Sequence, residues 1–288
     1  MKSEELDEQL AGYGDSVASA TRVTPGHALR PEDIALKEAP SSEDIAEYAL
    51  WLGDDALILS QRLQKWVSNA PEMEEDIALA NIALDLLGHA RSFLTFAGKF
   101  WDKDEDELAY FRDEDDFRNL VMVEQPNGHF GVTIARQLLF SVYLELLYSR
   151  LVKSEDEMIA AIADKSLREV QYHVDHAQQW TLRLGLGTEE SHEKMVHAFR
   201  VLWPHVEELF IDHPLQERLA EKGIAVLPST LREEWETRIK AVLEEASLEV
   251  PEEPGALVDG RSGNHSEHLG YILMEMQVLA RRHPGVKW

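Results

Sequence analysis

The sequence predicts an all-α protein, a four-helix bundle with additional C-terminal helices. Four long segments carry apolar residues at helical spacing, and short connections join the first to the second and the third to the fourth. Strand-like character is confined to one short run, GIAVLPS at 223–229. These observations favour helices packed on helices over a fold that contains a sheet.

The first two long helices are predicted over 42–67 and 71–100. Apolar residues of the first recur about every 3.6 residues, as on one face of a helix. Pro71 suits a helix start, and the acids that follow it suit the positive end of the helix dipole. From 76 to 100 the second helix is apolar nearly all round, a pattern typical of a buried helix.

The third and fourth long helices are predicted over 127–153 and 156–185, the fourth ending at a glycine as helices often do. The segment 101–128 between the two helix pairs is acidic, and we expect a loop with one or two helical turns. Shorter helices are expected near 191–212, 228–246 and 265–283.

We divide the chain into two parts. Residues 1–43 are polar, contain scattered Gly, Ser and Pro, and show no sustained periodicity, so we expect a flexible acidic N-terminal extension. Residues 44–288 are expected to form one helical domain, since they are numerous and apolar enough to enclose a sizeable core.

Charge and composition exclude several classes of function. The chain has 28 Lys and Arg against 54 Asp and Glu, a net charge of −26, which opposes binding to nucleic acid. Because salt screens self-repulsion, we hold a high-salt source as a hypothesis. Without cysteine, disulfides, thiolate metal sites and cysteine nucleophiles are excluded. The sequence shows neither a secretory signal nor a membrane span, so we expect a cytoplasmic protein without membrane contact.

Acids and imidazoles interrupt the apolar second and fourth helices. In the second helix, Asn81, Asp85 and His89 follow one another at intervals of four residues, which places all three on one face. Inward acids and imidazoles on two bundle helices suggest a core that holds metals. The fourth helix repeats the theme with Glu169, His173 and His176.

Ferritin-like di-iron proteins provide a scheme for testing this suggestion: one Glu from each of two helices and a Glu-x-x-His motif from each of the other two. Here the acid and the imidazole are four residues apart in both helices, and one residue of slip turns a side chain by about 100°. We therefore predict no metal site, but a vestigial, metal-free polar core whose members pair with one another. Its predicted members are Asp54, Asn81, Asp85, His89, Glu145, Glu169 and His173.

Two pairings illustrate this prediction: Asp85 with an arginine, or Glu169 with His173. We expect His129 and His176 to be hydrogen-bonded packing residues rather than ligands. His265 and His268 follow a Gly-rich turn, where polar capping of a helix start is the simpler interpretation. Two alternatives remain: a self-sufficient di-metal oxidase or ferroxidase, in which the slipped ligands converge, and a plain helical scaffold.

Several blocks carry a resemblance to a known family: LGDDALILSQRLQKW, EDIALANIALDLLGHAR, VEQPNGHFGVTIARQ, EVQYHVDHAQQW and the closing HSEHLGYILMEMQ with PGVKW. These blocks resemble the structural, non-catalytic subunit of phenylacetyl-CoA 1,2-epoxidase, the PaaC family. The resemblance covers about residues 44–288 and implies a ferritin-like bundle.

The resemblance implies a component of a bacterial monooxygenase complex that converts phenylacetyl-CoA to its ring 1,2-epoxide in phenylacetate catabolism. It implies that a homologous catalytic oxygenase subunit holds the di-iron centre and that a reductase component supplies the electrons. This chain would then contribute no catalytic residue and bind no cofactor, and would act within a hetero-oligomer.

The resemblance also places two segments near the CoA part of the substrate. Arg118 and Arg218 suit phosphate binding in an otherwise acidic chain. Alternatively, each arginine could pair with a nearby acid such as Asp115 or Glu221. The two segments are Asp116, Phe117, Arg118 and Asn119, and Glu217, Arg218 and Leu219.

Overall fold

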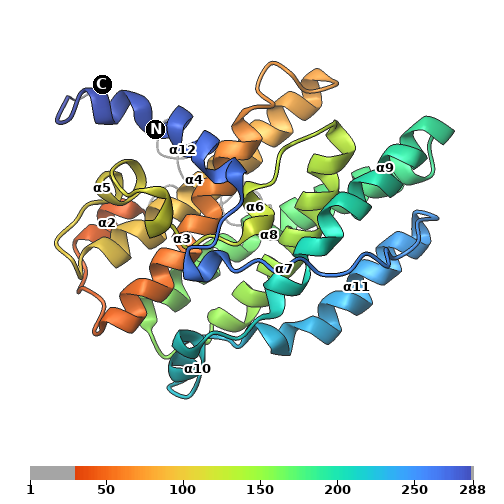
Figure 1. The fold of residues 1–288 in the computed structure, drawn as a ribbon. Coiled ribbons are helices and arrows are strands. Elements are labelled where there is room, and N and C mark those ends of the chain that lie inside the picture. The colour runs from red at the N-terminus through yellow and green to blue at the C-terminus, as the bar shows by residue number, and fades with distance from the viewer. Residues whose placement is uncertain (1–29, 287–288) are drawn as a thin grey trace, which may run out of the picture.

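The computed structural model describes residues 30–286 and confirms an all-α fold. Four long helices form the bundle: α3 (Glu43–Gln64), α4 (Met73–Gly98), α7 (Phe130–Leu151) and α8 (Glu157–Gly185). Helix α3 packs along α4 and α7 packs along α8, and the two pairs meet where α4 lies against α8 (Figure 1). One long connection separates the pairs, as in ferritin-like bundles.

Side-chain caps help to set where the bundle helices begin. The hydroxyl of Ser42 accepts a hydrogen bond from the backbone N–H of Ile45 at the start of α3. The carboxylate of Asp156 accepts bonds of 3.0 and 2.9 Å from the N–H groups of Met158 and Ile159 at the start of α8. These N–H groups have no partner within their own helix, so the caps satisfy them. All four long helices lie within their predicted spans.

The connection between α4 and α7 is more structured than a loop. It contains α5 (Glu105–Tyr110), the 3-10 turn η1 (Glu114–Asp116) and the short helix α6 (Val121–Glu124). All four residues of α6 are buried, and the helix contacts both α3 and α7. The acidic connection therefore turns into the core at its second half.

Further helices surround the bundle after α8. Helices α9 (Glu189–Leu202) and α11 (Arg232–Glu245) pack against α7 and α8, on the opposite side of the molecule from α5 (Figure 1). The chain then returns, and α12 (Glu267–Arg282) lies against α3 and α5. The remaining elements are α10 (Pro214–Ala220) and the 3-10 turns η2 (Trp203–His205), η3 (Glu207–Phe210), η4 (Pro228–Leu231) and η5 (Gly260–Ser262).

The run at 223–229 is not a strand, and the sequence interpretation missed α10 before it. The carbonyl oxygens of Gly223 and Ile224 accept hydrogen bonds from the N–H of Glu155 and the hydroxyl of Ser154, at 3.0 and 2.7 Å. Side-chain and loop groups thus replace the ladder that a strand would need. Between residues 30 and 286, strand-like pairing is limited to the isolated bridge between Asp259 and Asn264.

The short helix α2 (Pro31–Ala35) lies inside the predicted N-terminal extension. Ile34 is fully buried, and the amine of Lys99 at the end of α4 donates to the carbonyl oxygens of Ile34 and Ala35, at 3.3 and 2.9 Å. Residues 30–43 thus include a segment packed against α4 rather than only a free extension. Residues 1–29 lie outside the described residues, and the two-part division stays a prediction.

Burial of the whole second long helix is the part of the fold that was predicted wrongly. Helices α4 and α7 both have the length and apolar composition of a membrane span, as core helices also do. Inside the protein, 89% of the apolar window of α7 is buried, but only 50% of that of α4. Helices α3, α8, α2 and α5 all contact α4. The exposed side chains of Ile77, Asn81 and Leu84 show that the first half of α4 nevertheless meets solvent on one side.

Candidate functional site

Three imidazole–carboxylate pairs join α4 to α8, and we call them the seam pairs. In each pair one helix supplies the acid and the other supplies the imidazole. Two of the pairs arise because each helix carries an acid and, four residues later, a histidine, and the antiparallel arrangement sets acid opposite histidine. The seam pairs are His89 Nε2 with Glu169 Oε2 at 2.7 Å, His173 Nε2 with Asp85 Oδ2 at 3.1 Å, and His176 Nε2 with Glu75 Oε2 at 2.8 Å.

The imidazoles of the seam pairs are buried, whereas two of their acids keep contact with solvent. The side chain of Asp85 is 32% exposed and that of Glu169 is 31% exposed. Burial lowers the pKa of His173, and its hydrogen bond with Asp85 opposes this effect. A neutral imidazole that donates from Nε2 to a carboxylate places no isolated cation in the core. The seam pairs therefore give Nε2 of each buried imidazole a carboxylate partner, whereas Nδ1 of His89 and Nδ1 of His176 have no hydrogen-bond partner among the described residues.

The structure pairs these residues with one another, but not in the two ways that illustrated the prediction. Glu169 contacts His89 rather than His173, and Asp85 contacts His173 rather than an arginine. Asn81 was wrongly assigned to the polar core, because it is exposed on the outer side of α4. Spacing alone could not distinguish these outcomes, since partners on another helix decide them.

Asp54 and Glu145 also lie apart from the seam pairs, contrary to the prediction of a single polar core. The carboxylate of Asp54 is fully buried and accepts hydrogen bonds from Arg112, one of them at 2.9 Å. Glu145 Oε2 lies 2.5 Å from Arg238 on α11. Each acid is therefore held by an arginine from outside the four bundle helices.

The arrangement does not fit a ferritin-like di-iron centre. Such a centre needs carboxylates from all four helices and an imidazole from two of them. Here Asp54 and Glu145 are bound to arginines, and Asp85 and Glu169 are bound to imidazoles. Within 30–286, no group of three or more His, Asp or Glu side chains is placed to hold a metal ion. The geometry thus gives no support to the oxidase alternative.

A second polar group, which the sequence interpretation missed, sits where the C-terminal segment crosses the bundle. We call it the buried acid cluster, and its four carboxylates are at most 4% exposed. Arg112 and Arg261 supply its cationic partners, and His265 contacts Glu124. The buried acid cluster consists of Asp54, Asp55, Glu124 and Glu208.

Arg261 is the main link between the C-terminal segment and α3. Its guanidinium donates to Asp55 at 2.6 Å and to the carbonyl oxygens of Trp51 and Arg118, at 3.1 and 2.6 Å. Burial raises the pKa of Asp55, and the charge of Arg261 opposes this effect. The pair therefore keeps two charges in the core that neither partner could sustain alone.

Glu208 differs from the other cluster acids because, within the described residues, its hydrogen bonds come from main-chain groups alone. Its carboxylate accepts the N–H groups of Val121 and Gly260, both at 2.8 Å. Burial raises the pKa of Glu208 to about 7, although these hydrogen bonds and Arg261 act in the opposite direction. This acid thus titrates near neutral pH at the joint between η3 and η5.

The histidines that the sequence analysis interpreted as packing or capping residues differ in their hydrogen bonds. His265 is buried against Glu124 at 3.1 Å, while Ser266 caps α12 by accepting the N–H of His268, so the capping interpretation omitted the buried pair. His176 is hydrogen-bonded, as predicted. For His129 the prediction was wrong, since neither ring nitrogen has a hydrogen-bond partner among the described residues.

The first predicted CoA segment is largely built into the fold. Phe117 and Asn119 are fully buried, whereas Asp116 is exposed at the end of η1. Arg118 donates to the carbonyl oxygens of Asp115 and Phe117, at 2.6 and 2.7 Å. Within the described residues no carboxylate lies at ion-pair distance from Arg118, so its charge is free to meet an anion.

In the second predicted CoA segment, Arg218 is already neutralised. Its guanidinium bonds Asp44 at 2.9 and 2.8 Å, rather than the neighbouring Glu221. Leu219 is fully buried and Glu217 is exposed on the same short helix, α10. The ion pair would have to open before this segment could bind a phosphate.

The two predicted CoA segments contact α3 at different positions along its axis. Arg218 pairs with Asp44 near the start of α3, whereas the backbone N–H of Arg118 donates to Asp54. Ten helical residues correspond to about 15 Å along the axis. Only an extended ligand could therefore contact both segments.

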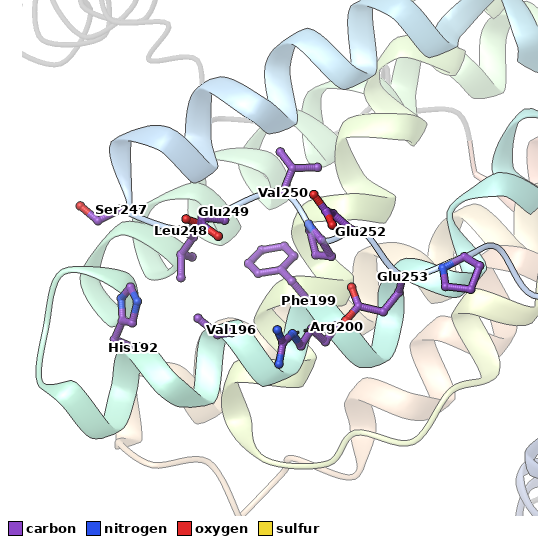
Figure 2. A pocket seen from close by; sticks show the side chains of 12 residues that line it. His192, Val196, Phe199, Arg200, Ser247, Leu248, Glu249, Val250, Glu252 and Glu253 are labelled. Carbon is purple, nitrogen blue, oxygen red and sulfur yellow. Dashed lines mark ion pairs between the residues drawn. The ribbon is translucent and has the colours of Figure 1, made fainter.

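A cavity lies away from both predicted CoA segments. It has a volume of about 760 Å³ and separates α9 from the segment 247–254 (Figure 2). Its lining includes Glu249, Glu252 and Glu253, and Arg200 is paired with Glu253 at 3.3 Å. Such an acidic lining opposes the phosphates of a CoA ester.

Comparison with known proteins identifies the family. Residues 30–288 match the profile of the phenylacetic acid catabolic protein family, PaaA and PaaC. The chain belongs to this family. One relative, a component of the 1,2-phenylacetyl-CoA epoxidase of Escherichia coli (strain K12), is 48% identical over 245 residues, which are 85% of this chain and 99% of the relative. The resemblance noted in the sequence is thereby confirmed, and the seam pairs and the buried acid cluster are features of a phenylacetic acid catabolic protein.

Proposed function

We propose that this chain is the structural subunit of a phenylacetyl-CoA 1,2-epoxidase that acts in phenylacetate catabolism. The observation that carries the proposal is the engagement of the seam residues with one another where a ferritin-like di-iron centre would need them free. The similarity to a component of the Escherichia coli epoxidase supports the same role.

In this proposal a homologous oxygenase subunit holds the di-iron centre, and a reductase component delivers electrons to it. This chain binds no metal itself, and the complex works in the cytoplasm on the ring of phenylacetyl-CoA. Arg118 has no carboxylate partner between residues 30 and 286, which supports a contribution to CoA-ester binding, because arginine matches phosphate geometry and the chain as a whole has a net charge of −26.

The contribution of the chain to the reaction is then structural. The seam pairs hold α4 against α8, and Arg261 holds the C-terminal segment across α3. A rigid subunit limits the ordering cost of assembly and keeps the oxygenase subunit in one geometry.

Replacing Asp85 with Leu tests this function. The change leaves the buried imidazole of His173 without its acceptor, so we expect lower thermal stability. Turnover of the assembled complex should change by less than about threefold, whereas disturbing a group that supports a metal ligand costs about 10–100-fold. The measurement is epoxidation of phenylacetyl-CoA by the reconstituted complex, with Asp85→Asn as the variant that keeps a hydrogen-bonding side chain. Loss of turnover in a folded, fully assembled Asp85→Leu complex would contradict the proposal.

A further inference from the structure

Helix α12 carries an apolar stripe on the side that faces away from the bundle. Tyr271, Met274 and Val278 are 60%, 60% and 39% exposed, and intervals of three and four residues place them along one face. Leu269 and Ile272 on the opposite face are buried and hold α12 on the bundle. A contiguous stripe of large, exposed apolar side chains is typical of a surface that another polypeptide segment covers.

A groove of about 400 Å³ lies between α12 and the start of η1. Its lining includes Gly270, Met274, Val278, Asp113 and Glu114. Two arginines lie at its end: Arg281 pairs with Asp113 at 2.8 Å, whereas Arg282 is exposed and has no carboxylate at ion-pair distance between residues 30 and 286. An apolar segment with an acidic edge would complement both the stripe and this cation. We call Tyr271, Met274, Val278 and Arg282 the α12 face.

The N-terminal extension of the chain has a sequence of this kind. Its apolar residues Leu6, Leu10, Tyr13 and Val17 recur at intervals of four, three and four residues, although the pattern does not continue beyond them. Between residues 4 and 15 the extension carries five acids and no Lys or Arg. The sequence of the extension therefore matches the α12 face in both polarity and charge.

The described part of the chain begins within reach of the α12 face. Glu32 of α2 and Glu105 at the start of α5 share the guanidinium of Arg91, at 3.7 and 2.7 Å. Helix α5 has six residues, is about 9 Å long and contacts α12 (Figure 1). The chain from residue 17 to residue 30 can span up to about 43 Å. This connection is long enough to pass α5 and reach α12.

The extension suits the α12 face better than a second copy of the chain does. Two copies would bring together net charges of −26 each. The extension, by contrast, is covalently tethered, so its local concentration at the face is high without any partner. Residues 1–29 also precede the part of the chain that matches the family profile, so this contact would be an addition to the shared helical domain.

We propose that residues 6–17 of this chain bind to the α12 face and cover it. The four apolar residues of the extension pack on the stripe, and its acids lie beside Arg282. The contact is made within one chain, so the inference goes beyond the proposed function and does not depend on it.

Introduced pairs of cysteines test the contact in the full-length protein, because the chain has no cysteine of its own. Leu10→Cys with Met274→Cys places one thiol in the extension and one on the α12 face. The matched control is Leu10→Cys with Leu186→Cys, because Leu186 is 58% exposed, close to the 60% of Met274, and lies at the end of α8. After mild oxidation, peptide mapping by mass spectrometry gives the rate of disulfide formation within the chain.

We expect the disulfide between residues 10 and 274 to form at least about tenfold faster than the control disulfide. A bound extension holds the first two thiols together, whereas the tether alone supplies only a diffuse local concentration to the control pair. Adding Arg282→Glu to the first pair should slow its disulfide by about two- to fivefold, the range expected for one surface charge pair. All variants should keep the helical signal of the unmodified chain.

Two results would overturn the inference. Equal rates for the two cysteine pairs would show that the extension does not bind to the α12 face and would leave that face to another protein. Disulfides between residues 10 and 274 that form only between chains, seen as covalent dimers, would make a second copy the occupant. Neither result bears on the proposed function, because no other subunit takes part in the measurement.

Discussion

Replacing Arg261 with Met should lower the free energy of unfolding by about 3–5 kcal/mol, because Asp55 is left as an uncompensated charge in the core. Asp55 is 1% exposed and cannot recruit water without opening the contact between α3 and the C-terminal segment. Chemical denaturation followed by far-UV circular dichroism measures the loss.

Two further variants show that the loss comes from the buried charge. Arg232→Ala removes a surface arginine that is 41% exposed and bound to two glutamates, and it should cost about 0–1 kcal/mol. Asp55→Asn combined with Arg261→Met removes both charges and should recover part of the stability lost in the single variant. If Arg261→Met were no more harmful than Arg232→Ala, the account of the buried acid cluster would be wrong.

Glu208→Gln should change how stability depends on pH between about 4.5 and 7. In the folded protein the pKa of Glu208 is raised from 4.5 to about 7, so the native state holds this proton more tightly than the unfolded chain. The resulting stabilisation is complete below pH 4.5 and is lost as pH rises through 7. Relative to Glu208→Gln, the unmodified protein should therefore lose on the order of 3 kcal/mol over this interval and stay level above it.

The comparison with the glutamine variant isolates this one group. Other titrating groups, such as His173 and His265, are present in both proteins and cancel in the difference. Glutamine cannot accept both N–H groups equally well, but that cost does not vary with pH. Denaturation curves recorded at several pH values provide the test, and a pH-independent difference between the two proteins would refute the assignment of the pKa shift to Glu208.

The long helices were predictable because their signals are local. Apolar spacing, Pro71 and the capping residues Ser42 and Asp156 all lie within or beside the segment that they define. Short helices such as α2 and α10 are not determined by local signals alone. A helix of one or two turns is unstable alone, so contacts with distant parts of the chain decide whether it forms.

The sequence predicts that α4 and α8 carry buried polar residues, but it does not predict which residues pair with each other. An acid and an imidazole four residues apart on two apolar helices signal a buried polar seam, and the spacing argues against a di-iron motif. The match of Asp85 with His173 joins residues that are 88 positions apart, and that of Asp55 with Arg261 joins residues that are 206 apart. The adjacent acids Asp54 and Asp55 in the apolar first helix were a signal for the buried acid cluster. Nothing in the sequence indicated that Arg112 and Arg261 would be their partners.

The prediction that the whole of α4 is buried was wrong for a simple physical reason. A helix that is apolar all round can be covered by its own chain or by another one, and the pattern of residues is the same in both cases. Asn81 was placed in the core for this reason and instead lies on the outer side of α4. The structure distinguishes the two cases because it shows which side of α4 its own chain leaves open.

Iron content is the most direct test of the central proposal that this chain is the structural and not the catalytic subunit. Elemental analysis is made on the purified chain before and after incubation with ferrous iron, and on the complex with the oxygenase subunit. We expect no stoichiometric iron in the chain alone, and iron in the complex in proportion to the oxygenase subunit. About two irons per chain in the protein alone, the number needed for a paired-metal site, would contradict the proposal and make this chain an oxygenase in its own right.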